Sequence, residues 1–224
     1  MPLEIINKVQ EAILFQLADT LDSKEFYLTG GTALSLFYLK HRRSNDLDFF
    51  TNNPELILPF SYNLEKDLKK SGFKPTRQRG LHSFVEIIVK KDGESTIIHL
   101  AQDTPFRLEA VKQFPEYPKL NVDSLVDVAT NKLLALFGRA TLRDFIDIYF
   151  LINKKHFSVE ELVLNSKKKD PGFDLYWLGV ALERISTFKD DSPEMLLLLE
   201  PVDFREMLTF FSEWREKITR GLLK

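Results

Sequence analysis

The sequence predicts an α+β protein, with a mixed sheet and flanking helices in its N-terminal half and helices alone in its C-terminal half. The first indication is a change of pattern, because β-prone segments alternate with helical ones early in the chain and helical periodicity prevails from Asp123 onward. The second is the bridging stretch with Pro105, Pro115 and Pro118, which disfavours regular structure. We expect a boundary there, with domains over residues 1–118 and 119–224.

The individual elements follow from hydrophobic spacing and from turn residues. Strands are expected where β-prone residues are bounded by glycine, asparagine or proline, at 26–28, 46–50, 84–90 and 96–101, the last two as a hairpin. N-terminal helices are expected at 3–20, 33–39 and 60–71. The C-terminal half is expected to hold helices at 125–137, 145–152, 159–164, 175–185 and 204–218.

Composition excludes several classes of protein. The chain has no cysteine, so disulfides, thiolate metal sites and cysteine nucleophiles are excluded, and a reducing compartment is expected. No targeting signal or membrane-spanning stretch is evident, so we expect a cytoplasmic protein without a membrane partner. With 31 basic and 33 acidic side chains, any nucleic acid would need a local basic patch.

One basic segment lies within residues 66–79. It is either a solvated helix face followed by an exposed strand, or a local surface for RNA. Its basic residues are Lys66, Lys69, Lys70, Lys74, Arg77 and Arg79.

A glycine turn follows the first expected strand. Gly30 and Gly31 have no side chain to block a ligand or to restrict φ, so the backbone can approach a phosphate closely. The helix that begins near Thr32 would direct free N–H groups to the same place, and the Thr32 hydroxyl would add a donor. A tight turn without a ligand is the alternative.

Two carboxylates lie on the next strand. Side chains alternate along a strand, so Asp46 and Asp48 face the same side while Leu47 faces the other. Adjacent like charges repel unless a cation neutralises them, and carboxylate oxygens suit Mg²⁺ or Mn²⁺ bound together with substrate phosphates. A plain surface strand is the alternative.

The two segments together resemble a known family. Leu28-Thr29-Gly30-Gly31-Thr32-Ala33-Leu34 and His41-Arg42-Arg43-Ser44-Asn45-Asp46-Leu47-Asp48 resemble the AbiEii/AbiGii-type toxins of the DNA polymerase β-like nucleotidyltransferase superfamily. The resemblance implies a polymerase β-like N-terminal domain, a metal at Asp46 and Asp48, and nucleotide binding by Gly30, Gly31, Thr32, Arg42 and Ser44.

A later motif matches the same family at Asn131-Lys132-Leu133-Leu134-Ala135 and at Arg143-Asp144-Phe145-Ile146-Asp147. The resemblance implies that Lys132 contacts nucleotide phosphates and that Asp144 is an essential residue of the active-site cleft. From the residues alone, Lys132 would be the polar edge of a helix, and Asp144 would pair with a nearby arginine.

The sequence departs from the superfamily pattern at one position. Many members carry a third carboxylate on a later strand, where this chain has His99. Glu86 on the preceding strand or Asp103 beyond this one would be the substitutes; alternatively, Asp46 and Asp48 would hold the metal between them without a third acid.

The resemblance implies an enzyme that moves an NMP from an NTP to an acceptor, with tRNA or another RNA as the expected acceptor. Such a protein would be the toxin of a toxin–antitoxin or phage-defence module, with a cognate antitoxin as its partner. The alternatives are a nucleotidyltransferase that modifies a small-molecule hydroxyl, and a degenerate nucleotide-binding protein without catalysis.

Overall fold

The computed structural model describes residues 5–104, 106–154 and 156–221, and it divides into two compact units at Leu125/Val126. Leu3, Glu4 and Pro105 therefore lie outside the described residues. The expected boundary at residue 118 falls inside a strand of the first unit, Tyr117–Val122. Each unit is described by itself below.

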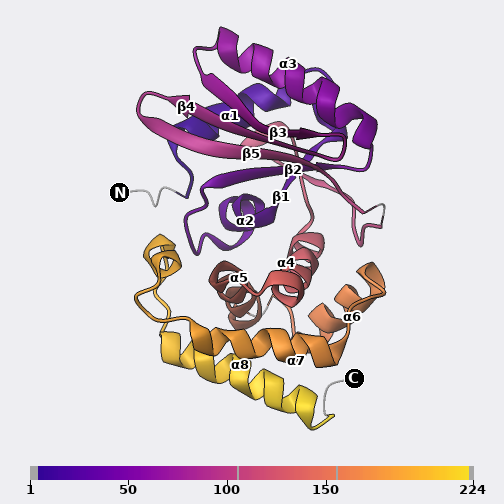
Figure 1. Cartoon of the computed structure of the whole chain (residues 1–224), viewed down its shortest axis with the longest axis vertical. Coiled ribbons are helices and arrows are strands. Elements are labelled where there is room, and N and C mark those ends of the chain that lie inside the picture. The colour runs from indigo at the N-terminus through magenta and orange to yellow at the C-terminus, as the bar shows by residue number, and fades with distance from the viewer. Residues whose placement is uncertain (1–4, 105, 155, 222–224) are drawn as a thin grey trace. The chain divides into compact units, whose positions relative to one another are not determined.

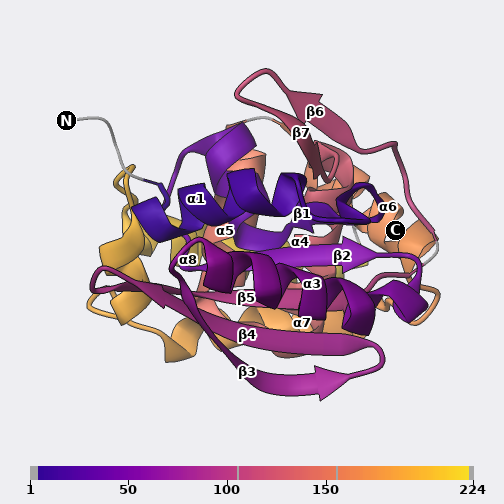
Figure 2. The same cartoon turned by 90° about the horizontal axis from the view of Figure 1, so that it is seen from above.

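The described part of the first unit forms one mixed sheet of seven strands, ordered β3-β4-β5-β2-β1-β7-β6. β2 pairs antiparallel with β1 and parallel with β5, and β4 pairs antiparallel with both β3 and β5 (Figure 2). The strands are β1 (Tyr27–Thr29), β2 (Asp46–Thr51), β3 (Lys74–Leu81), β4 (Phe84–Lys91), β5 (Glu94–Gln102), β6 (Lys112–Phe114) and β7 (Tyr117–Val122).

Two amphipathic helices, α1 (Lys8–Ala18) and α3 (Ile57–Lys70), cover one face of this sheet (Figures 1 and 2). α1 begins with a capping box, in which Asn7 and Gln10 each accept a hydrogen bond from the other's backbone N–H. Short 3₁₀ turns, Ser23–Glu25 and Pro54–Leu56, lie before β1 and before α3. The core of the first unit lies between the two helices and the sheet.

The sheet residues that face this core alternate with residues on the other face. The buried set consists of aliphatic and aromatic side chains of β2, β4 and β5, namely Leu47, Phe49, Val85, Ile87, Val89, Ile98 and Leu100. Their neighbours Asp46, Asp48, Glu86 and His99 are half-buried on the opposite face. The expected strands in this part of the chain are confirmed.

The glycine pair turns the chain from β1 directly into a helix, because Gly30, with a φ of +69°, is also the first residue of that helix. α2 (Gly30–Ala33) starts at Gly30 and continues as a π-helix over Leu34–Leu39. The N–H of Lys40 donates to the carbonyl of Ser35, five residues back, and Lys40 then ends the helix with a positive φ. The helix expected over 33–39 therefore begins earlier.

The bridging stretch is more regular than its prolines suggest. Pro115 lies in the tight connection between β6 and β7, where Phe114 pairs with Tyr117. Pro118 lies near the start of β7, where a missing N–H is tolerated. The expectation that this stretch lacks regular structure was wrong, because turn and strand-start positions accommodate proline without loss of a sheet.

The described part of the second unit is helical, as expected. Its helices are α4 (Leu125–Arg139), α5 (Leu142–Asn153), α6 (Val159–Lys169), α7 (Leu175–Glu183) and α8 (Phe204–Thr219), with 3₁₀ turns at Arg184–Thr187 and Pro193–Leu197. Ser158, Asp174 and Asp203 cap α6, α7 and α8 through their side chains. No helix in the described ranges has both the length and the apolar character that crossing a bilayer requires.

Candidate active site

Gly30 lies directly against the carboxylate of Asp48. A Cβ placed on Gly30 would stand 2.2 Å from Oδ2 of Asp48, far inside van der Waals contact. Gly30 also has a φ of +69°, a conformation that side chains disfavour. Glycine is therefore required here both by backbone conformation and by the space that Asp48 occupies.

Gly31 is packed in the same way against Arg42 and Ser44. A Cβ on Gly31 would lie 2.5 Å from Nη2 of Arg42 and 3.1 Å from Oγ of Ser44. Both side chains are largely buried, and Nη1 of Arg42 donates to the carbonyl of Arg43 at 2.9 Å. Arg42 and Ser44 therefore support the glycine turn from within the fold.

The hydroxyl of Thr32 donates to the backbone carbonyl of Asp46 at 2.5 Å, and Thr32 is fully buried. Its hydroxyl therefore joins the start of α2 to the start of β2. The Thr32 hydrogen bond and the close packing of Gly30 on Asp48 thus bring segments 28–34 and 41–48 side by side.

His99 on β5 connects Asp48 to Glu86 on β4. Nδ1 of His99 is 2.8 Å from Oδ1 of Asp48, and Nε2 is 3.5 Å from Oε2 of Glu86. The hydrogen bond to Asp48 raises the pKa of His99 above its ordinary value against the lowering effect of burial, and the charges of Asp48, Asp46 and Glu86 add to the rise. The position expected for a third carboxylate thus holds an imidazole between two acids.

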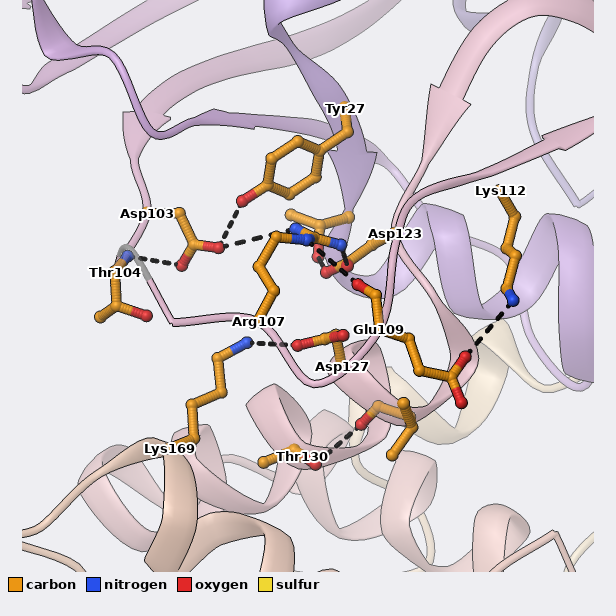
Figure 3. Close-up of polar contacts among 12 residues, drawn as sticks. Tyr27, Asp103, Thr104, Arg107, Glu109, Lys112, Asp123, Asp127, Thr130 and Lys169 are labelled. Carbon is orange, nitrogen blue, oxygen red and sulfur yellow. Dashed lines mark hydrogen bonds and ion pairs between the residues drawn. The ribbon is translucent and has the colours of Figure 1, made fainter.

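Asp103 belongs to a different cluster (Figure 3). Its carboxylate accepts hydrogen bonds from the Tyr27 hydroxyl and from the backbone N–H of Thr104. Arg107 lies over the Tyr27 ring, 4.2 Å from its centroid, and pairs with the buried Asp123. The pKa of the Tyr27 hydroxyl is raised above its ordinary value, mainly by burial and next by the hydrogen bond to Asp103. Of the two candidate third acids, Glu86 is the one that lies in register with His99 and Asp48 across neighbouring strands.

In the second unit, Lys132 on α4 pairs with Asp147 on α5. Nζ of Lys132 is 2.8 Å from Oδ2 of Asp147, and both side chains are at least nine-tenths buried. Asp144 instead accepts two hydrogen bonds from Arg139, at 2.8 and 2.9 Å, and one from the Thr141 hydroxyl at 2.6 Å. Asp144 thereby caps the start of α5. The pairing of Lys132 with Asp147 was not foreseen from the sequence.

The basic segment 66–79 is divided between α3 and the edge strand β3. Arg77 donates to Glu65 and Ser61 and lies over the ring of Tyr62, so it is part of the packing between α3 and β3. Lys70 pairs with Asp67 on the helix surface. The other members, Lys66, Lys69, Lys74 and Arg79, are exposed.

The donor atoms around Asp48 fit a divalent cation that also binds a ligand. Mg²⁺ is usually held by one or two carboxylates together with waters and substrate phosphates. Asp46 and Asp48 supply two carboxylates on one strand face, and that of Asp48 lies beside the bare Cα of Gly30. Within residues 5–104, 106–154 and 156–221, no three His, Cys, Asp or Glu side chains are grouped so as to hold a metal alone.

Known proteins are similar to this chain in sequence or in fold. The chain is 28% identical over 214 residues to the uncharacterised protein aq_aa25 of Aquifex aeolicus (strain VF5), covering 92% of this chain and 94% of that protein. A crystal structure of a candidate nucleotidyltransferase from H. pylori matches with a TM-score of 0.61 and 23% identity, over 96% of this chain and 93% of that chain.

A second solved structure, MenT4, a nucleotidyltransferase toxin from Mycobacterium tuberculosis H37Rv, matches with a TM-score of 0.53 and 18% identity, over 94% of this chain and 85% of that chain. At these identities the two structures show a shared fold. The family model described as "Nucleotidyl transferase AbiEii toxin, Type IV TA system" matches residues 12–216. Because this model covers most of the sequence, the chain belongs to the AbiEii nucleotidyltransferase toxin family.

Proposed function

We propose that the protein transfers a nucleoside monophosphate from an NTP to a hydroxyl of RNA, with tRNA as the expected acceptor. The acceptor oxygen would form a bond to the α-phosphorus, and the bond from that phosphorus to the β-phosphate oxygen would break. Pyrophosphate would leave, and the hydroxyl proton would pass to solvent. Positioning and electrostatic stabilisation carry most of the rate of such reactions.

The observation that carries the proposal is the contact of Gly30 with Asp48. A carboxylate lies 2.2 Å from the place where any other residue at position 30 would have its Cβ. Bare main chain and a carboxylate are thus adjacent at one point, which suits a triphosphate that is held by a backbone turn and by a cation at once.

Asp46 and Asp48 would hold the divalent ion, Mg²⁺ or Mn²⁺. The bound ion would neutralise phosphate charge in the transition state. Gly30, Gly31 and Thr32 would present the turn to the phosphates, and Arg42 and Ser44 would maintain its shape from behind, since both are packed against Gly31.

The second unit would supply Lys132 for the nucleotide phosphates. Its ion pair with Asp147 keeps the ammonium at a defined place on α4. Asp144 would contribute by fixing the start of α5, the helix that carries Asp147. In this proposal the N-terminal domain forms the nucleotidyltransferase core.

RNA as the acceptor is favoured by the exposed lysines and arginine of α3 and β3, since phosphate contacts dominate nucleic-acid affinity. The family is one of type IV toxin–antitoxin systems, so the activity would be toxic in the cytoplasm and would be countered by a cognate antitoxin.

The test is incubation of the full chain with each NTP, labelled at the α-phosphate or at the γ-phosphate, together with Mg²⁺ and total cellular RNA. We expect the α-label, and not the γ-label, on one class of RNA, and no labelling with Asp46→Asn or Asp48→Asn. The exposed Asp92→Asn is the matched control.

Labelling of RNA by the γ-phosphate, or full activity of Asp48→Asn, would overturn the proposal. Label on small metabolites and not on RNA would mean that the acceptor is a small-molecule hydroxyl.

A further inference from the structure

A row of polar side chains crosses three adjacent strands of the sheet. Asp48 on β2 pairs in register with His99 on β5, which pairs in register with Glu86 on β4. All three lie on the half-exposed face. The two carboxylates approach different nitrogens of one imidazole ring, at 2.8 and 3.5 Å. The ring is therefore held from both sides.

We propose that His99 is a positioning residue that fixes the carboxylate of Asp48 for metal binding. Oδ1 of Asp48 accepts the hydrogen bond from His99, whereas Oδ2 is the atom nearest the place of a Cβ on Gly30. Because the hydrogen bond from His99 fixes Oδ1 of Asp48, it also fixes the direction in which Oδ2 points. This inference rests on the proposed function, because it assumes that Asp48 binds the divalent ion.

The surroundings of His99 restrict its ring. Phe84 stacks on the imidazole with ring centroids 5.6 Å apart and an interplanar angle of 29°, which sets the ring plane. Glu86 lies at Nε2, so the opposite nitrogen, Nδ1, is directed to Asp48. A carboxylate at position 99 would repel Asp48 in the absence of a cation, whereas the imidazole orients it beforehand.

Outer partners of metal-binding carboxylates typically change metal affinity or activity by about 10- to 100-fold when removed. His99 therefore has a measurable signature that a purely structural side chain would lack: its loss would change the affinity for the metal alone, without nucleotide or acceptor. The probe is Mn²⁺, whose free fraction is followed by electron paramagnetic resonance.

The experiment compares three substitutions of His99 in the full chain. His99→Asn retains an N–H donor near the place of Nδ1, His99→Gln has its donor near the place of Nε2, and His99→Leu has neither. We expect His99→Leu to weaken Mn²⁺ binding by about 10-fold or more. His99→Asn should bind more tightly than His99→Gln, because it alone keeps a donor facing Asp48. His82→Gln, at an exposed histidine, should bind as the wild type does.

Thermal melting of each variant shows that it is folded. Wild-type Mn²⁺ affinity in a folded His99→Leu protein would overturn the positioning role, and so would a His99→Asn protein that binds no better than His99→Gln. Should His99→Leu fail to fold, the comparison of Asn with Gln decides. Asp48→Asn separates the two ideas, since unchanged Mn²⁺ affinity in that variant would reject the proposed metal site itself.

Discussion

Lys132 on α4 and Asp147 on α5 form a 2.8 Å ion pair in which the carboxylate is fully buried. Removing one partner of a buried pair leaves the other charge poorly compensated, which typically costs about 3–5 kcal/mol. We expect Asp147→Ala to lower the free energy of unfolding by about that amount, as measured by urea denaturation.

The control for Asp147→Ala is Glu200→Ala, which removes the partner of Lys154 in a more exposed pair. Exposed pairs contribute about 0–1 kcal/mol, so little change is expected. Equal losses in the two variants would show that burial does not determine the cost of losing either pair.

Gly30→Ala should lower the rate of transfer by about 100-fold, whereas Gly93→Ala should leave it nearly unchanged. Both glycines have positive φ, +69° and +85°, so both substitutions carry a similar backbone cost. An added Cβ at Gly93 has no atom within 4 Å, whereas at Gly30 it would lie 2.2 Å from Asp48. Displacing a reacting group by about 1 Å can cost about 100-fold in rate.

The measurement is labelled-NTP transfer, with circular dichroism to confirm folding of both glycine variants. Substantial transfer by a folded Gly30→Ala protein would mean that the contact with Asp48 plays no part in catalysis.

Asp144 should make the stability of the protein depend on pH. Burial alone would raise the pKa of Asp144, but the hydrogen bonds from Arg139 and Thr141 and the charge of Lys132 lower it below its ordinary value. A lowered pKa in the folded state gives stability that is fully present above the unfolded-state pKa of about 3.9. That stability is lost as the pH falls through the folded-state pKa.

The measurement is the difference in unfolding free energy between wild type and Asp144→Asn as a function of pH. We expect a constant difference near neutral pH that shrinks in acid, and no such trend for the exposed Asp190→Asn. A difference that grows in acid would contradict the lowered pKa.

Lys169→Ala should destabilise the helical unit more than Lys167→Ala on the same helix. Nζ of Lys169 is 3.0 Å from Oδ1 of Asp127, and both side chains are almost completely buried (Figure 3). Lys167 is exposed. The expected loss at Lys169 is about 3–5 kcal/mol by chemical denaturation, and similar melting of the two variants would contradict it.

The sequence by itself determined the α+β class, most of the strands and the C-terminal helices. The reason is local: the alternation along Asp46–Thr51 and the helical spacing of apolar residues are properties of short segments. The same alternation placed Asp46 and Asp48 on one face. The end of α6 was missed, because α6 continues from Leu164 to Lys169, where a lysine turns inward to a buried acid of another helix.

Only the tertiary structure decided which side chains meet. Gly30 and Asp48, His99 and Glu86, and Lys132 and Asp147 all lie on different elements, so no spacing along the chain brings them together. Strand order and register made His99 the neighbour of Asp48 and left Asp103 with Tyr27. Local propensity comes from neighbours in sequence, whereas the partners of buried polar groups are determined by packing between distant segments.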